Sequence, residues 1–318
     1  METKFFFFIN FEKSIFLLGI IINIFYLYYI RSLASEEKYS KKLKNFDYIS
    51  YQNYFITNKI KNKAGWMYTS DKQYYLMNGI IRKHRPKNCL EVGVAKGGSS
   101  ILILNAIRDI DNSRLVSLDL NKNFYMNKSL LTGYRVKQYF PELTAKWQLF
   151  TGEQPHIFLK KLNIKFDFVF LDTAHISPGE IINFIEILPF LNENAILVLH
   201  DIMFHFDKET IREKIVSISS PQLLLMSAIC GDKILIKNNQ GIDNMGVIFL
   251  YGNQKNHYLD YFLLLLSFWD YLPTKKQINE IRIFIKEYYK DELYLFIFDT
   301  AIKNNYGYVK KIKKYIHN

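Results

Sequence analysis

The chain has 318 residues, of which 49% are hydrophobic and 23% charged, and it carries a formal net charge of +12. These proportions are those of an ordinary globular protein, so they exclude collagen-like, disordered and low-complexity classes. The two cysteines, Cys89 and Cys230, are too few for a disulfide framework and fit no zinc spacing. The basic excess is spread along the chain, which indicates attraction to an anionic membrane surface rather than to nucleic acid.

The first 34 residues contain an uncharged apolar run, Ile15–Ile30. As a helix it would span roughly 24 Å, somewhat less than a bilayer core. Basic residues follow from Arg31 onward, which by the positive-inside rule keeps the rest of the chain in the cytoplasm. Residues 1–34 are therefore predicted to form a membrane anchor. Two alternatives stay open: a helix that lies in the interface or the core, and a signal peptide cleaved after Ala34.

Residues 35–64 are polar and rich in Lys and Tyr, which predicts a linker with a helix. From residue 65 to 255, short apolar runs alternate with helical stretches, a pattern typical of a parallel sheet covered on both faces. The predicted strands are Asn88–Val92, Leu115–Leu118, Trp147–Phe150, Phe166–Leu171, Ala195–Leu199, Lys233–Ile236 and Met245–Leu250. The last two are joined by an Asn/Gly-rich loop and predict an antiparallel hairpin at the sheet edge.

The helices between these strands follow from the remaining apolar periodicity. They are predicted over Lys72–Lys83, Ser99–Arg108, Leu130–Phe140, Pro155–Leu162, Pro178–Phe190 and Lys208–Ser217. Residues 256–318 are predicted to form a helical appendage after the α/β domain. The domain organisation is thus an N-terminal hydrophobic segment, a linker, one α/β domain and this appendage.

A glycine-containing turn follows the first predicted strand, with glycines at positions 93, 97 and 98. Glycines let a ligand approach the backbone closely, and they adopt backbone angles that residues with side chains resist. Asp119, at the end of the next strand, can accept hydrogen bonds from both hydroxyls of a ribose. The glycine spacing does not fit the pyrophosphate fingerprint, and Glu91 would repel a diphosphate. Glu91 suits a cationic partner such as the amino group or sulfonium of S-adenosylmethionine.

With this turn, Asp119 and the terminal hairpin, the stretch from residue 65 to 251 resembles the class I S-adenosylmethionine-dependent methyltransferases. More narrowly, it resembles the branch of macrolide-sugar and rhamnosyl O-methyltransferases and proteins labelled cephalosporin hydroxylase. The resemblance implies a Rossmann-like, seven-stranded α/β fold. It also implies that the cofactor contacts Glu91, Gly93, Val94, Ala95, Gly97, Asp119, Gly152, Glu153 and Asp172.

Polar residues follow two of the predicted strands. Asp172 and His175 follow the strand Phe166–Leu171, and His200 and Asp201 follow the strand Ala195–Leu199. The carboxyl ends of parallel strands share one crevice, so these groups should face the same site. Such groups can bind a divalent ion or move a proton. The resemblance implies a metal site, with magnesium expected, made by Asp172, Asp201 and His200, and a base role for His175. Two structural roles stay open: local hydrogen bonding by His175 and capping by Asp201.

These features predict an O-methyltransferase that acts on a hydroxyl of a sugar or glycolipid with help from a divalent metal. Because S-adenosylmethionine is made in the cytosol, the catalytic domain is expected on the cytoplasmic side of the membrane. The alternative is an inactive cofactor-binding or scaffold protein with the same fold. A metal-assisted hydroxylase ranks last, because only the same four Asp and His groups could bind its iron. The acceptor and the oligomeric state cannot be deduced from the sequence.

Overall fold

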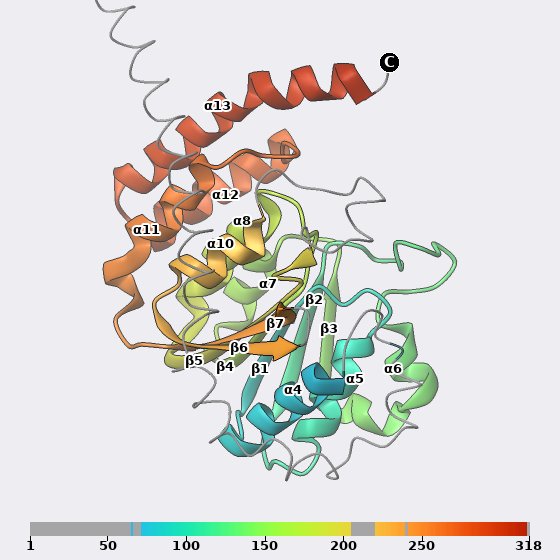
Figure 1. The fold of residues 1–318 in the computed structure, drawn as a ribbon. Coiled ribbons are helices and arrows are strands. Elements are labelled where there is room, and N and C mark those ends of the chain that lie inside the picture. The colour runs from blue at the N-terminus through green and yellow to red at the C-terminus, as the bar shows by residue number, and fades with distance from the viewer. Residues whose placement is uncertain (1–64, 66–70, 205–219, 239–240, 317–318) are drawn as a thin grey trace, which may run out of the picture.

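The computed structural model describes residues 65, 71–204, 220–238 and 241–316. Its centre is a seven-stranded sheet in the order β3-β2-β1-β4-β5-β7-β6 (Figure 1). The strands are β1 (Asn88–Val92), β2 (Arg114–Asp119), β3 (Trp147–Thr151), β4 (Phe166–Leu171), β5 (Leu191–His200), β6 (Gly231–Asn238) and β7 (Gly241–Leu250). Strands β1 to β5 are parallel, whereas β7 runs antiparallel to both β5 and β6. The predicted seven-stranded sheet with its terminal hairpin is confirmed.

The strands are apolar on both faces because the sheet separates two cores. Successive strand residues point to opposite faces. Leu90 and Val169 therefore enter one core, and Cys89 and Phe168 enter the other. All four side chains are completely buried. This double burial explains why the strands look like continuous apolar runs in the sequence.

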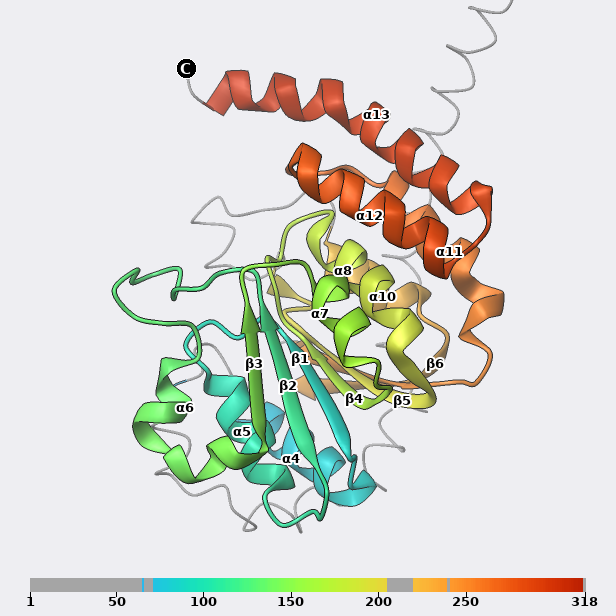
Figure 2. The same ribbon diagram turned by 180° about the vertical axis from the view of Figure 1, so that it is seen from behind.

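Helices form a layer on each face of the sheet (Figure 2). One core contains residues of α4 (Asp71–His84) and α5 (Gly98–Ile107), with α6 (Tyr134–Tyr139) at its margin. The other contains residues of α7 (Pro155–Leu162), α8 (Gly179–Ile187) and α10 (Pro221–Ala228). The carboxyl ends of β1 to β5 lie between these two layers, where the predicted site residues are located.

The expected helical appendage is present and consists of α11 (Tyr258–Leu263), α12 (Lys275–Tyr288) and α13 (Glu292–Ile316). Trp269, Phe284 and Phe298 are buried in the same core as α8. A capping box between Thr274 and Gln277 begins α12. The appendage therefore packs onto one helix layer, while the domain boundaries near residues 65 and 255 stay a prediction.

The segment between α11 and α12 also contacts the loop that precedes α8. The Ser177 amide donates to the Asp270 carboxylate at 2.8 Å, and the Asp270 amide donates to the Ser177 carbonyl at 2.8 Å. This reciprocal pair links the appendage to the loop that carries His175.

Some predicted elements were wrong in extent, and one helix was not predicted. The helix expected from Leu130 begins only at Tyr134, because Gly133 has a φ of 71° and ends a long loop just before it. The strand expected from Ala195 begins at Leu191. Helix α10 was not predicted, although Pro221 is a favourable residue for a helix start.

The predicted anchor at residues 1–34, the linker and the helix Lys208–Ser217 lie outside the described residues. Among the helices that the structure does describe, none is both long and apolar enough to cross a membrane.

Candidate functional site

The glycine turn after β1 brings the ends of two strands into direct contact. Gly93 has a φ of 91°, and a Cβ at this position would lie 1.7 Å from the carbonyl oxygen of Asp172. Only glycine fits so close an approach. Gly97 has a φ of 93° and immediately precedes α5. The predicted cofactor turn is therefore adjacent to the end of β4.

Asp119, at the end of β2, fixes the shape of this turn. One of its carboxylate oxygens accepts hydrogen bonds from the amides of Val94 and Ala95, both at 3.0 Å. The other oxygen accepts from the Asn121 amide at 2.8 Å. Each carboxylate oxygen has two lone pairs, so the second oxygen can still accept a ribose hydroxyl.

The two residues predicted near the adenine follow β3. The Gly152 amide donates to the Asp119 carbonyl at 3.0 Å, which places the end of β3 beside the end of β2. Glu153 is half-buried and forms an ion pair with Lys276 of α12 at 3.2 Å. Their contact with a cofactor stays a prediction.

Glu91 lies beneath the turn and has no exposed surface. Its carboxylate accepts hydrogen bonds from the hydroxyls of Ser99, Ser100 and Ser117 at 2.5, 2.6 and 2.5 Å. Burial raises the pKa of Glu91 to about 7, and the three hydroxyls act in the opposite direction. These bonds give Glu91 a structural role that its sequence motif did not indicate. A direct contact with the cofactor stays a prediction.

The Glu91→Gln substitution should remove a pH dependence of stability. Glu91 keeps its proton to about pH 7 when folded but only to about pH 4.5 when unfolded. Between these values the folded state binds more protons, so the free energy of unfolding falls as the pH rises, by ~3 kcal/mol in full. Glutamine has no such titration. Denaturant unfolding at several pH values should show that the free energy of unfolding falls less with rising pH in Glu91→Gln than in the wild type. An equal fall in both proteins would contradict the raised pKa of Glu91.

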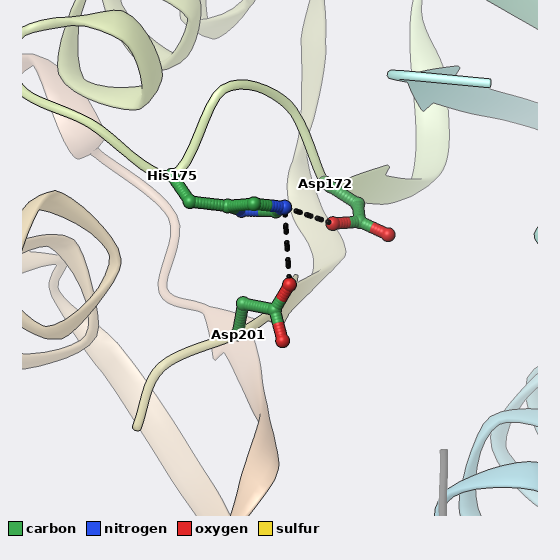
Figure 3. Close-up of side chains that lie close together, drawn as sticks. All are labelled: Asp172, His175 and Asp201. Atoms are coloured by element: carbon green, nitrogen blue, oxygen red, sulfur yellow. Dashed lines mark ion pairs between the residues drawn. The ribbon is translucent and has the colours of Figure 1, made fainter. Parts of the chain in front are cut away.

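Asp172, His175 and Asp201 form a compact group, called here the Asp/His cluster (Figure 3). The His175 Nε2 atom lies 3.1 Å from an Asp201 oxygen and 3.6 Å from an Asp172 oxygen. One ligand atom from each residue lies within 4.8 Å of the others. The donor set of two carboxylates and one imidazole fits a divalent cation.

The backbone at this cluster has an unusual conformation. His175 and Asp201 have φ values of 58° and 56°, in the left-handed region that few non-glycine residues adopt. Such a conformation costs on the order of 1–3 kcal/mol per residue and is concentrated at functional sites. The observation supports a function for both side chains.

His200 lies directly behind the cluster and is almost completely buried. Its Nδ1 atom is 3.4 Å from Asp172 and 3.3 Å from Asp201, and its Nε2 atom is 3.3 Å from the Gln73 amide oxygen. Burial lowers its pKa, but the carboxylates of Asp201 and Asp172 outweigh burial and raise the pKa to about 10. The proton on His200 therefore competes with any cation for the same carboxylates. Its role as a metal ligand stays a prediction.

The structure adds two residues that contact His175 and that the motifs did not indicate. The Gln222 amide nitrogen lies 3.0 Å from His175 Nδ1 and 3.2 Å from the carboxylate of Glu180. Glu180 also accepts from the His175 amide and from the Thr173 hydroxyl, the latter at 3.0 Å. Burial raises the pKa of Glu180, while His175 acts in the opposite direction. Since Gln222 contacts Nδ1, the Nε2 atom is the nitrogen that faces the two aspartates.

Asn244 is a third residue of the site that the motifs did not indicate. Its side-chain amide donates a hydrogen bond to Asp201. It lies on β7, and its amide oxygen accepts from the Met203 amide at 2.8 Å. In the sequence Glu180 looks like an ordinary acid in the first turn of a helix, and Gln222 and Asn244 belong to no motif. No sequence signal would have identified them.

The comparison with protein families agrees with this geometry. Residues 90–202 match the model of a family described as a methyltransferase domain. The match includes the glycine turn, Asp119 and the whole Asp/His cluster. The predicted class of enzyme, an S-adenosylmethionine-dependent methyltransferase, is confirmed.

Several solved structures are similar to this chain. They include the O-methyltransferase TomG of Streptomyces achromogenes, involved in tomaymycin synthesis and in complex with S-adenosylmethionine (18% identity, 66% of this chain and 96% of that chain, TM-score 0.45). The methyltransferase PaMTH1 of Podospora anserina (17%, 67% and 96%, TM-score 0.46) and an O-methyltransferase of Bacillus cereus (14%, 65% and 97%, TM-score 0.45) were solved with S-adenosylhomocysteine. No curated protein sequence matches the chain.

Proposed function

We propose that the methyltransferase domain methylates a hydroxyl group of a sugar or glycolipid with help from a divalent cation. The observation that carries this proposal is the convergence of Asp172, His175 and Asp201 within 4.8 Å. The cluster is next to the glycine turn, because the Asp172 amide donates to the Val92 carbonyl at 2.9 Å. Metal and base chemistry thus lies beside the predicted cofactor site.

Each side chain has a distinct role in this proposal. The bound cofactor supplies a methyl group on a positively charged sulfur, and the cation lowers the pKa of a hydroxyl that it binds. The backbone of residues 93–97 surrounds the methionine part of the cofactor, and Asp119 accepts a hydrogen bond from a ribose hydroxyl of the cofactor. Asp172 and Asp201 bind the cation, with His200 as the proposed third ligand.

His175 is the proposed base that removes the proton of the acceptor hydroxyl. Its side chain is 23% exposed, compared with 17% for Asp172, 11% for Asp201 and 3% for His200. It is therefore the most accessible group of the site. Uptake of the proton at Nε2 requires the tautomer with its hydrogen on Nδ1, in which Nδ1 is the donor toward the Gln222 side-chain amide. Proton transfer also requires contact at hydrogen-bond distance.

The Asp119→Ala substitution should weaken cofactor binding at least about tenfold, because buried hydroxyls lose their acceptor. Calorimetry with S-adenosylhomocysteine measures this directly. Asp167→Ala is a matched control, since Asp167 accepts from the amides of Lys87 and Asn88 at the opposite end of the sheet. Asp119→Asn keeps the side-chain volume if the alanine variant misfolds. Wild-type affinity in both folded Asp119 variants would refute the ribose assignment.

His175 is proposed as the base, but the geometry also favours a role as third metal ligand through Nε2. Measurements of metal affinity distinguish these two roles. Calorimetry with Mn²⁺ should show an affinity loss of at least about tenfold for Asp172→Asn and Asp201→Asn. His175→Ala should keep the Mn²⁺ affinity but lose methyl transfer. A matching affinity loss in His175→Ala would make His175 a ligand instead of the base. Unchanged affinity in both aspartate variants would refute the metal site.

Gln222 is expected to act as a positioning residue for His175. The Gln222→Leu variant keeps similar volume but cannot form the hydrogen bond with Nδ1 that fixes the tautomer, so kcat should fall about 10–100-fold. The pH–rate profile should shift, while the affinity for S-adenosylhomocysteine stays the same. Gln254→Leu is a control, because Gln254 bonds to Tyr261 far from the cluster in the fold. An unchanged kcat and pH profile in Gln222→Leu would contradict this role.

We further propose that the domain works at the cytoplasmic face of a membrane. The support is the apolar run Ile15–Ile30, the basic residues after it and the cytosolic origin of the cofactor.

The alternative function, an inactive cofactor-binding or scaffold protein, is favoured if the purified protein binds the cofactor and Mn²⁺ but methylates no glycan or glycolipid acceptor.

A further inference from the structure

A loop with an apolar surface projects from the carboxyl edge of the sheet. It comprises residues 120–131, directly after β2, and is called here the apolar loop (Figure 2). Within the described part of the chain, ten large apolar side chains are exposed, and four of them belong to this loop. These four are Leu120, Tyr125, Met126 and Leu131, with exposed fractions of 55, 59, 61 and 62%. Such a concentration of apolar surface marks an interaction site.

The shape of the apolar loop is fixed by its own hydrogen bonds. Asn123 and Leu131 form an antiparallel bridge, and the Phe124 amide donates to the Leu130 carbonyl at 2.9 Å. Phe124 is buried, and its ring lies 6.1 Å from that of Tyr134 on α6. The loop is therefore a defined hairpin-like structure that holds its apolar side chains outward.

Both ends of the apolar loop are connected to the cofactor turn. At the first end, Asn121 donates from its amide to Asp119 and accepts from the Thr132 hydroxyl at 2.7 Å. At the second end, the Gly133 amide donates to the Ala95 carbonyl at 2.9 Å. Whatever the loop contacts is consequently held next to the methyltransferase site.

The charge of this region points to an anionic partner. Residues 120–140 contain four basic side chains, Lys122, Lys128, Arg135 and Lys137, and no acidic one. Aromatic and aliphatic side chains mixed with lysines are typical of segments that lie in the interface of an anionic bilayer.

We propose that the apolar loop inserts into the headgroup region of an anionic lipid bilayer and holds the site at the lipid surface. The proposal extends the proposed function, because a site held there suits an acceptor carried by a lipid. The contact is separate from the predicted anchor at residues 1–34, since it involves only residues of the α/β domain. It should also depend on salt, because lysines contribute part of it.

The test uses the full chain with an environment-sensitive dye at Met126→Cys, in a Cys230→Ser background that leaves only the buried Cys89. Vesicles that contain phosphatidylglycerol should shift the dye emission to the blue, and lipid-bound bromine should quench it. Leu259→Cys is the matched control, an exposed apolar position on α11. Adding Lys128→Ser to the labelled protein should raise the half-saturating lipid concentration about fivefold.

Two results would overturn the proposal. In the first, the protein sediments with vesicles while the dyes at positions 126 and 259 respond equally. In the second, the dye at position 126 shifts with protein concentration in the absence of lipid, which would make the apolar loop an interface between copies of the chain. The measurement needs no methyl transfer, so it can succeed or fail independently of the proposed function.

Discussion

The whole site depends on one steric constraint, the contact between the turn after β1 and the end of β4. A side chain at Gly93 would overlap the Asp172 carbonyl, and the Asp172 amide is bonded to Val92 at 2.9 Å. This contact aligns the predicted cofactor turn with Asp172, and through the parallel pairing of β4 with β5 it also aligns the turn with Asp201. In the proposed reaction, the cofactor and a metal-bound hydroxyl must meet with the correct geometry for transfer, and such alignment accounts for much of the rate enhancement of enzymes.

The second constraint is electrostatic, because four carboxylates gather around this contact. Glu91 and Glu180 have no exposed surface, and their raised pKa values reflect the cost of burying charge. Each is offset by neutral donors, the serine hydroxyls for Glu91 and Gln222 for Glu180. Asp172 and Asp201 instead face two imidazoles, and burial and His200 act in opposite directions on the pKa of Asp201, which is lowered overall. Only this second pair belongs to the proposed metal site.

The sequence predicted the parts of this protein that follow from local chemistry. Apolar runs predicted the strands and the terminal hairpin, and strand-final acids and glycine positions predicted the residues at the carboxyl edge of the sheet. It could not predict Gln222 and Asn244, which reach His175 and Asp201 across 47 and 43 residues, because packing alone creates these contacts. The same limit explains the error at residues 130–133, where apolar leucines suggested a helix. In the structure Leu131 pairs with Asn123 and is exposed, which local periodicity cannot reveal.

Two structures outside the central sheet contact the site from different directions. The apolar loop is bonded to the cofactor turn through Gly133 and Ala95, and the appendage is bonded to the His175 loop through Asp270 and Ser177. The carboxyl edge of the sheet carries the residues of the proposed chemistry, and the fold alone does not determine the acceptor. Both additions are bonded to segments that carry proposed site residues. The residues that select the acceptor should therefore be sought in the apolar loop and between α11 and α12, rather than among the strand ends.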